Sequence, residues 1–309
     1  MKSPMLFPGQ ASQYVGMGKD YYDRFPEARE LYRQANQTLG FDITELSFSG
    51  DLEELTKTHN AQPAILLHSI VVLTVLEGQG IRPSIVAGHS LGEFSALVAA
   101  GFFKPLDALL IVRRRGELMF ESGLERPGTM AAVIGLEVTG LTEAVAEASV
   151  DGIVVIANYN SPSQFSISGE VEAVDKAMAL AKDKGAKRVM KLQVSGAFHS
   201  PLMEPTISPL RKYLEKFRHG HLTVPWVANV TGKVVEDDDQ VLDLLSRQLS
   251  SPVRWVDSMR LLADRAEGPV LEVGPGKVLA GLMKRIDEAI PVHPLTDVGS
   301  FAAVLEGSE

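Results

Sequence analysis

A serine stands at the centre of a glycine-flanked turn, Gly88-His89-Ser90-Leu91-Gly92. A short β-branched run at 84–87 precedes it and an amphipathic stretch at 91–100 follows, so the spacing predicts a strand that passes directly into a helix. Such a nucleophile elbow has glycine on both sides because strand and helix approach closely there. An ordinary strand-to-helix turn would also satisfy so short a pattern.

The rest of the chain alternates predicted strands with predicted helices, which is typical of an α/β fold with a largely parallel sheet. The stretch 64–76 is apolar on all sides and predicts a buried helix. A helix over 105–122 begins with a proline and is expected to stop at Gly123. Later elements are expected as helices at 203–217, 241–249 and 278–286, and as short strands near Trp226, near Val234 and at 270–273.

The middle of the chain has a different order of elements. Strand, helix, strand, strand, helix and strand are predicted at 130–136, 141–148, 153–158, 164–168, 172–184 and 188–194. This order is the ferredoxin-like split unit, and its size suits an independent module. We therefore expect a ferredoxin-like insert at 127–195 within a catalytic core formed by 1–126 and 196–309.

Composition excludes several classes of protein. The chain has no cysteine, which excludes disulfides, thiolate metal sites and a cysteine nucleophile. Its net charge of −9 argues against nucleic acid as a partner. We find no signal peptide, no stretch as long as a membrane span and no metal-ligand spacing. The sequence thus predicts a soluble cytoplasmic protein without metal or cofactor.

A serine nucleophile needs a base, and histidine is the usual one. His68 falls in the apolar stretch and is predicted to be a core residue. His89 adjoins the serine, but neighbouring side chains on such a turn diverge. His199 lies on a loop before a proline-started helix, where catalytic residues are common, and is modestly favoured over His89. The remaining histidines are expected to be solvated: His59, His219, His221 and His293.

Three consecutive arginines differ in their predicted surroundings. On a helix, neighbours lie three or four residues apart, so Arg113 and Arg114 face Glu117, whereas Arg115 has only apolar neighbours. A buried guanidinium without a partner is costly. Arg115 is therefore expected to bind an anion, such as a ligand carboxylate. Snorkelling to the surface or pairing with an internal acid would also satisfy it.

Six segments, in order along the chain, share a pattern with one known family. They are Phe7-Pro8-Gly9-Gln10-Ala11-Ser12-Gln13, Gly88-His89-Ser90-Leu91-Gly92-Glu93, Asn158-Tyr159-Asn160-Ser161-Pro162, Gly196-Ala197-Phe198-His199-Ser200, Gln248-Leu249-Ser250-Ser251-Pro252-Val253 and Glu272-Val273-Gly274-Pro275-Gly276. Together they resemble the malonyl-CoA:acyl carrier protein transacylases. The resemblance covers essentially the whole chain and implies an α/β-hydrolase-like core with a ferredoxin-like insert.

The resemblance also implies roles for particular residues. Ser90 would be the acylated nucleophile and His199 its base. A backbone carbonyl, that of Gln248, would orient the histidine in place of an acid. The backbone N–H groups of Gln10 and Leu91 would form the oxyanion hole.

Two further residues are implied to bind substrate. Arg115 would hold the free carboxylate of malonate, and Asn160 would line the site near the histidine. The sequence departs from the family at two places. Ala11 stands where the family usually has glycine, and Pro4 stands where a strand usually runs.

The implied reaction is transfer of malonyl from malonyl-CoA to the phosphopantetheine thiol of an acyl carrier protein, through a malonyl ester on Ser90, for fatty acid synthesis. The protein is expected to be a monomer with no nucleic-acid or membrane partner. Candidate carrier-docking patches are Lys187, Arg188 and Lys191, and Lys284 and Arg285, although ordinary solvated faces have the same charges.

Three alternatives remain open at this point. One is a malonyl acyltransferase that serves polyketide synthesis. A second is a serine thioesterase or hydrolase, in which water accepts the acyl group. The third is a carrier-binding module that has lost activity.

Overall fold

The predicted strand before the serine, β2 (Arg82–Gly88), is central in a six-stranded sheet of order β10-β9-β1-β2-β7-β8. The computed structural model describes residues 1–266 and 268–306. The other strands of this sheet are β1 (Lys2–Phe7), β7 (Trp226–Ala228), β8 (Lys233–Val235), β9 (Val270–Glu272) and β10 (Val292–Pro294). All pairs are parallel except β7–β8. The expected α/β class is confirmed, with a mixed rather than wholly parallel sheet.

Both faces of this sheet are buried, as a mostly parallel sheet requires. Met5 and Phe7 of β1 belong to one apolar cluster, and Leu6 between them belongs to the opposite one. The first cluster includes α5 (Thr58–Gly78), α6 (Gly92–Ala99) and α7 (Pro105–Glu125). The second includes α12 (Trp255–Ala263) and α13 (Val278–Ile286). The alternation along β1 thus places a helical layer on each face.

Further helices surround this unit, and the first four, in the segment between β1 and α5, have no counterpart in the sequence predictions. The helices are α1 (Lys19–Arg24), α2 (Pro26–Leu39), α3 (Ile43–Phe48), α4 (Leu52–Thr56), α10 (Ile207–Leu214), α11 (Val241–Gln248) and α14 (Val298–Glu306), with 3₁₀ turns at Pro201–Thr206 and Asp238–Gln240. The predicted helix at 203–217 is divided between a 3₁₀ turn and α10, because Pro205 lacks the N–H that a continuous α-helix needs.

Two other helix predictions are corrected. Helix α7 continues past Gly123, because that glycine serves a close approach rather than a stop: a Cβ there would lie 2.0 Å from the carbonyl oxygen of Ser195. Helix α5 is longer than predicted and, with a mean hydropathy of 1.5, is long and apolar enough to cross a membrane. The expectation that no stretch reaches that length was wrong. Of the most apolar 18-residue segment of α5, 83% is buried inside the protein. Helix α5 is therefore accounted for as a core helix.

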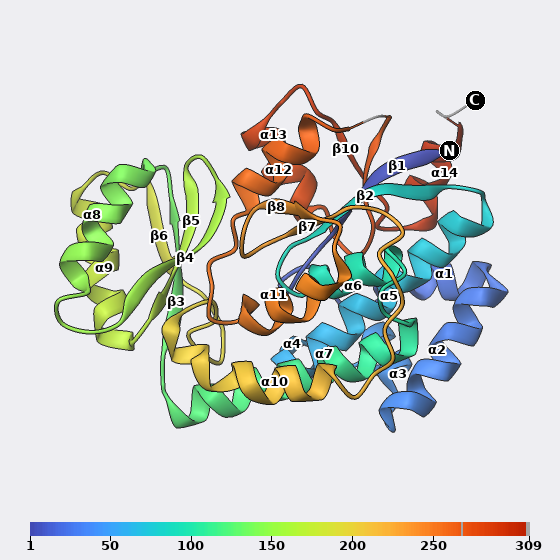
Figure 1. Ribbon diagram of the computed structural model, residues 1–309, viewed down its shortest axis with the longest axis horizontal. Coiled ribbons are helices and arrows are strands. Elements are labelled where there is room, and N and C mark those ends of the chain that lie inside the picture. Colours follow the sequence, from blue (N-terminus) through green and yellow to red (C-terminus); the bar gives the residue numbers. More distant parts are fainter. Residues whose placement is uncertain (267, 307–309) are drawn as a thin grey trace.

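A separate antiparallel sheet of order β4-β5-β3-β6 lies beside the larger unit (Figure 1). Its strands are β3 (Thr129–Ile134), β4 (Val154–Ser161), β5 (Gln164–Gly169) and β6 (Arg188–Lys191). Helices α8 (Val138–Ala148) and α9 (Val171–Asp183) pack on it and enclose an apolar cluster of their own. The six predicted elements of this region are all present, with shifted ends.

Backbone hydrogen bonds join the middle of β4 to the larger unit. The amide of Tyr159 donates to the carbonyl of Val253 at 2.9 Å, and the amide of Val253 donates to the carbonyl of Ala157 at 2.8 Å. These bonds hold β4 against the segment that follows α11.

Strand β1 runs through Pro4, where the sequence raised a conflict. Its register against β2 shifts between Ser3 and Met5, which is where the proline lacks a ladder donor. The irregularity is local, and the pairing resumes from Met5 to Phe7.

Candidate active site

Loops that follow three neighbouring strands bring the candidate residues to one edge of the large sheet. Gln10 follows β1, Ser90 follows β2 and Asn229 follows β7. The carboxyl ends of parallel strands are where α/β proteins form their sites. Strand β1 is also the point at which the chain order reverses, with β2 on one side and β9 on the other.

The elbow has the backbone that its two glycines predict. Ser90 has a φ of 51°, in the left-handed region. A Cβ on Gly88 would lie 1.9 Å from the carbonyl carbon of Gly92, and one on Gly92 would lie 2.0 Å from the carbonyl oxygen of Phe7. Larger residues therefore do not fit at either position. An ordinary strand-to-helix turn would not need this geometry.

His199 is the histidine that meets the serine. Its Nε2 lies 2.8 Å from the Oγ of Ser90. Its Nδ1 lies 3.0 Å from the carbonyl oxygen of Gln248 and 3.2 Å from that of Ser251. Two carbonyl acceptors require a proton on Nδ1, so Nε2 is left to accept the serine proton.

His89 has a different environment. Its Nε2 lies 2.8 Å from the Oδ1 of Asn160, and its ring is 5.2 Å from that of Trp255. Of the two histidines, His199 is therefore the one in contact with the Oγ of Ser90. Among the other histidines, His68 is fully buried and His221 and His293 are exposed, as predicted. His59 and His219 are half-buried instead of solvated, because their rings pack on Phe120 and Phe102.

Burial is the main reason that His199 stays neutral. Desolvation, followed by the positive charge of Arg115, lowers the pKa of His199 to about 3. An imidazole that is neutral throughout the physiological range can accept a proton at any such pH.

Two backbone amides at the site are free to donate. Within the described part of the chain, the N–H groups of Gln10 and Leu91 donate to no carbonyl or side chain. By contrast, the amide of Ser90 donates to the Oδ1 of Asn229 at 2.7 Å. Unpaired N–H groups next to a nucleophile can stabilise an oxyanion.

Arg115 lies directly beneath the serine, with 1% of the residue exposed. One guanidinium nitrogen, Nη2, donates to the Oγ of Ser90 at 3.0 Å and to the Oε1 of Gln248 at 2.6 Å. The other, Nη1, donates to the Oε1 of Gln62 at 2.8 Å. Snorkelling is therefore excluded, and the protein's own hydrogen-bond partners of this cation are neutral.

The neighbouring arginines behave as their spacing predicts. Arg113 and Arg114 bond to Glu117 at 3.0 and 3.1 Å. Arg115 is thus the arginine of the three without a carboxylate in contact.

Sequence reasoning missed the side chains that support the site. Glu93 is 1% exposed, and its Oε1 accepts from the amide of Asn229 at 2.7 Å. The side-chain amide of Gln248 donates to the backbone carbonyl of Ser90 at 2.7 Å and also to Glu93. Two features of the sequence could have predicted these residues: Asn229 comes directly after a strand, and Glu93 lies in the elbow helix.

A cavity of about 470 Å³ opens over Ser90 and His199. Its wall is mostly apolar, and includes Met119, Met130 and Phe198. Gln10 and Asn160 also line it. Asn160 lies in the cavity as expected, but its hydrogen bond is to His89 rather than to His199. The cavity lies where β4, α13 and the elbow meet.

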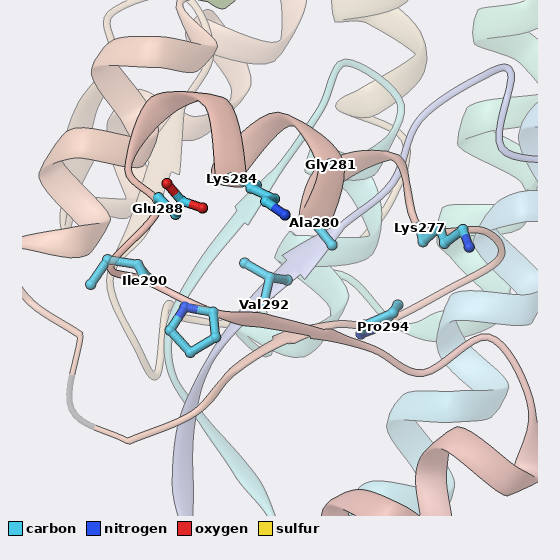
Figure 2. Close-up of a pocket in the computed structure, with 9 residues that line it drawn as sticks. Lys277, Ala280, Gly281, Lys284, Glu288, Ile290, Val292 and Pro294 are labelled. Carbon is cyan, nitrogen blue, oxygen red and sulfur yellow. The ribbon is translucent and has the colours of Figure 1, made fainter.

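A second cavity, of about 540 Å³, lies between α13 and β10. Figure 2 shows Lys277, Lys284 and Glu288 around it, together with apolar residues. It contains neither serine nor histidine. The Gly274-Pro275-Gly276 turn beside it serves close packing, since a Cβ on Gly274 would lie 2.7 Å from Pro8.

Known proteins resemble the chain over nearly its full length. Residues 5–302 match the acyl transferase domain family. The malonyl CoA-acyl carrier protein transacylase of Bacillus subtilis is 42% identical over 96% of this chain and 94% of its own. The enzyme of the same name from Escherichia coli K12 is 42% identical over 97% and 98%.

Solved structures agree. A malonyl-transacylase in complex with a type II PKS acyl-carrier protein superimposes with a TM-score of 0.96, at 39% identity, over 99% of this chain and 100% of that one. An acyl carrier protein S-malonyltransferase from Vibrio cholerae gives 0.94 at 38% identity, over 98% and 100%.

The low pKa of His199 predicts how the reactivity of Ser90 varies with pH. Labelling of Ser90 by a fluorophosphonate probe is expected to keep its rate from about pH 7.5 to about pH 5, because the histidine stays neutral. With a pKa near 6.5, the rate would fall about thirtyfold over that range. A decline with a midpoint near 6.5 in the second-order labelling rate would contradict the environment described for His199.

The left-handed backbone of Ala11 predicts that glycine at this position would stabilise the protein. Its φ of 78° is left-handed, and its side chain is exposed. We expect Ala11→Gly to raise the free energy of unfolding by up to about 1.5 kcal/mol, because relief of about 1–2 kcal/mol of strain outweighs about 0.5–1 kcal/mol of added chain entropy. Urea denaturation measures this change. Ala11→Val, with a β-branch at the same φ, should lower stability; the opposite order of the two variants would be inconsistent with strain.

Proposed function

Because this chain belongs to the acyl transferase domain family, we propose that it moves an acyl group through an ester on Ser90, with His199 as the base. The enzyme transfers malonyl to an acyl carrier protein, for fatty acid or polyketide synthesis. The observation that carries the residue assignment is the 2.8 Å contact between the Oγ of Ser90 and the Nε2 of His199.

In the first half-reaction, the Oγ of Ser90 attacks the thioester carbonyl of malonyl-CoA while the Nε2 of His199 takes its proton. The amides of Gln10 and Leu91 donate to the tetrahedral oxyanion. The C–S bond then breaks, and the CoA thiolate receives the proton from His199. Malonyl remains as an ester on Ser90, and the histidine is neutral again.

The second half-reaction reverses these steps with another thiol. The phosphopantetheine thiol of the carrier gives its proton to His199 and attacks the ester carbonyl. The bond to Ser90 breaks, and the serine oxygen takes the proton back. The Gln248 and Ser251 carbonyls that accept from Nδ1 keep the histidine in the same tautomer through both halves.

Arg115 is proposed to bind the free carboxylate of malonyl. Its Nη2 already reaches the atom to which malonyl becomes attached, at 3.0 Å. A guanidinium can turn two N–H groups toward a carboxylate. Asn160 is proposed to line the acyl cavity from the side of β4.

Water is the competing acceptor, because a serine hydrolase would use the same nucleophile. The absence of a carboxylate from the contacts of His199 within the described residues, and the likeness to transacylases, support a thiol acceptor. A polyketide-type acyltransferase would use the same chemistry. The two alternatives therefore differ in the pathway that receives the malonyl group and not in mechanism.

For the architecture, we propose an α/β-hydrolase-like core, 1–126 and 196–309, with a ferredoxin-like insert, 127–195. The order β3, α8, β4, β5, α9, β6 and the separate apolar cluster support the insert. The elbow at the carboxyl end of β2 supports the core.

The carrier is proposed to dock near the mouth of the acyl cavity. Each of the two basic patches keeps two exposed cations that form no ion pair with any described residue: Lys284 and Arg285 on α13, and Lys187 and Arg188 near β6. The third cation of the β6 patch, Lys191, is bound by Asp175 at 2.8 Å. A cytoplasmic location, a monomeric state and the lack of a cofactor stay predictions from the sequence.

The ester on Ser90 is the first test of this function. After exposure to malonyl-CoA, mass spectrometry is expected to find one malonyl group on the wild-type protein and none on Ser90→Ala. The adduct should persist in buffer and disappear on addition of a pantetheine thiol. Loss in buffer as fast as with the thiol would favour a hydrolase, and no adduct at all would favour an inactive binding module.

The role of Arg115 predicts a change of selectivity. In Arg115→Ala, the ratio of kcat/KM for malonyl-CoA to that for acetyl-CoA should fall about thirtyfold or more, which is about 2 kcal/mol. This is below the about 3–5 kcal/mol typical of a broken buried pair, because Gln62 and Gln248 already hold the guanidinium when no malonyl is bound.

Arg114→Ala is the matched control, since Arg114 lies on the same helix and bonds to Glu117 and Glu121 at the surface. It should keep the wild-type ratio. An unchanged ratio in Arg115→Ala would refute the carboxylate assignment.

A further inference from the structure

A buried carboxylate lies behind the arginine, and the proposed mechanism does not use it. Glu93 is on α6, two residues past Leu91, and only 1% of it is exposed. Its Oε1 accepts from the amide of Asn229 at 2.7 Å, and its Oε2 accepts from the Nε2 of Gln248. A buried acid in contact with the groups that hold the nucleophile needs an explanation.

Arg115 fixes the orientation of the Gln248 side chain. Arginine has no acceptor, so the side-chain oxygen of Gln248 faces Arg115, with Oε1 2.6 Å from Nη2. The amide nitrogen of Gln248 must then face Glu93 and the carbonyl of Ser90. Gln248 is thus a bridge between a buried cation and a buried carboxyl.

The hydrogen bonds and the burial of Glu93 act in opposite directions. Both of its neighbours are donors, which suits an ionised carboxylate. Its removal from water favours the neutral acid and dominates, so that the pKa of Glu93 is raised to about 8. Small changes in nearby charge therefore decide its protonation near neutral pH.

Arg115 is the charged group that acts on Glu93. Among the described residues on elements packed against α6, no other charge contributes to the pKa of Glu93. His199 and His89 lie near Ser90, and burial lowers the pKa of both, so they add no charge near neutral pH. The balance is between one buried cation and one buried acid.

We propose that Glu93 sets the affinity of the acyl site for a carboxylate: when ionised it competes, through Gln248, with the malonyl carboxylate for Arg115. The inference rests on the proposed function. A malonyl carboxylate on Arg115 would place two anions around one cation in a dry site, so Glu93 takes up a proton when malonyl binds. An acetyl group brings no charge and leaves Glu93 as it was.

The selectivity for malonyl over acetyl depends on whether Glu93 is ionised. Below about pH 8 Glu93 is neutral and Arg115 is available to malonyl. Above it, Glu93 is ionised and must gain a proton before malonyl binds well. The selectivity for malonyl over acetyl therefore falls as the pH rises, whereas effects of His199 and of the leaving thiol cancel in the ratio.

The test is the ratio of kcat/KM for malonyl-CoA to that for acetyl-CoA, measured for formation of the Ser90 ester. In the wild-type enzyme the ratio should fall about fourfold between about pH 7 and about pH 8.5, as expected for one group of pKa near 8. In Glu93→Gln, which cannot ionise, the ratio should fall by less than about 1.5-fold over this range, because burial lowers the pKa of Arg115 only to about 9. A constant wild-type ratio would overturn the proposal without any variant.

Glu272→Gln is the matched control. Glu272 is also fully buried and accepts two backbone amides, from Leu279 and Ala280, and burial raises its pKa to about 7. It has no arginine partner among the described residues. This variant should keep the wild-type fall in the ratio; if it also abolishes the fall, general loss of a buried acid is responsible and the proposal is wrong.

Proton uptake gives a readout that does not depend on rates. In weak buffer with an indicator dye at about pH 8, the wild-type enzyme should take up about half a proton more per malonyl ester than Glu93→Gln does, since the proton released by the CoA thiol is common to both. No difference would overturn the proposal. Failure of the proposed function is distinct, because no malonyl ester would then form on Ser90 in either protein.

Discussion

A guanidinium out of contact with water organises the centre of this enzyme. Arg115 lies under Ser90, and its two Nη nitrogens donate to two glutamine oxygens and to the serine oxygen, whereas its Nε has no partner among the described residues. A buried cation imposes its demand for acceptors on everything around it. It orients Gln248, and Gln248 in turn meets Glu93 and the carbonyl of Ser90. The backbone of the elbow and the charge of Arg115 are therefore parts of one network.

The same cation affects His199. It contributes to the low pKa of this histidine, so the imidazole is neutral where it contacts the Oγ of Ser90. Backbone carbonyls in place of a carboxylate at Nδ1 are consistent with this arrangement, since a nearby anion would stabilise the imidazolium and also attract Arg115 away from a substrate. The site then keeps one strong charge, that of Arg115, for which we propose the acyl carboxylate as partner.

Several features could be predicted from local patterns. The strand, the turn and the helix around Ser90 followed from two glycines and a β-branched run, because the close approach there excludes every larger residue. The burial of Arg115 followed from helical spacing. The helices between β1 and α5 were not predicted, and α5 was predicted too short. Side-chain periodicity is weak where a helix is buried on all sides, as α5 is.

By itself, the sequence determined the elbow around Ser90, the α/β class, the order of elements in the small sheet and the arginine that needs an acceptor. Each depends on residues close together along the chain, whose spacing limits the backbone directly. The tertiary structure brought His199 rather than His89 to Ser90, gave Arg115 neutral partners in place of an acid, and placed Glu93 behind Gln248. These contacts join residues 71 to 155 positions apart, and no periodicity carries such information. These contacts form because the order of the strands brings distant segments together and because water is excluded from the site. They therefore exist only in the folded chain.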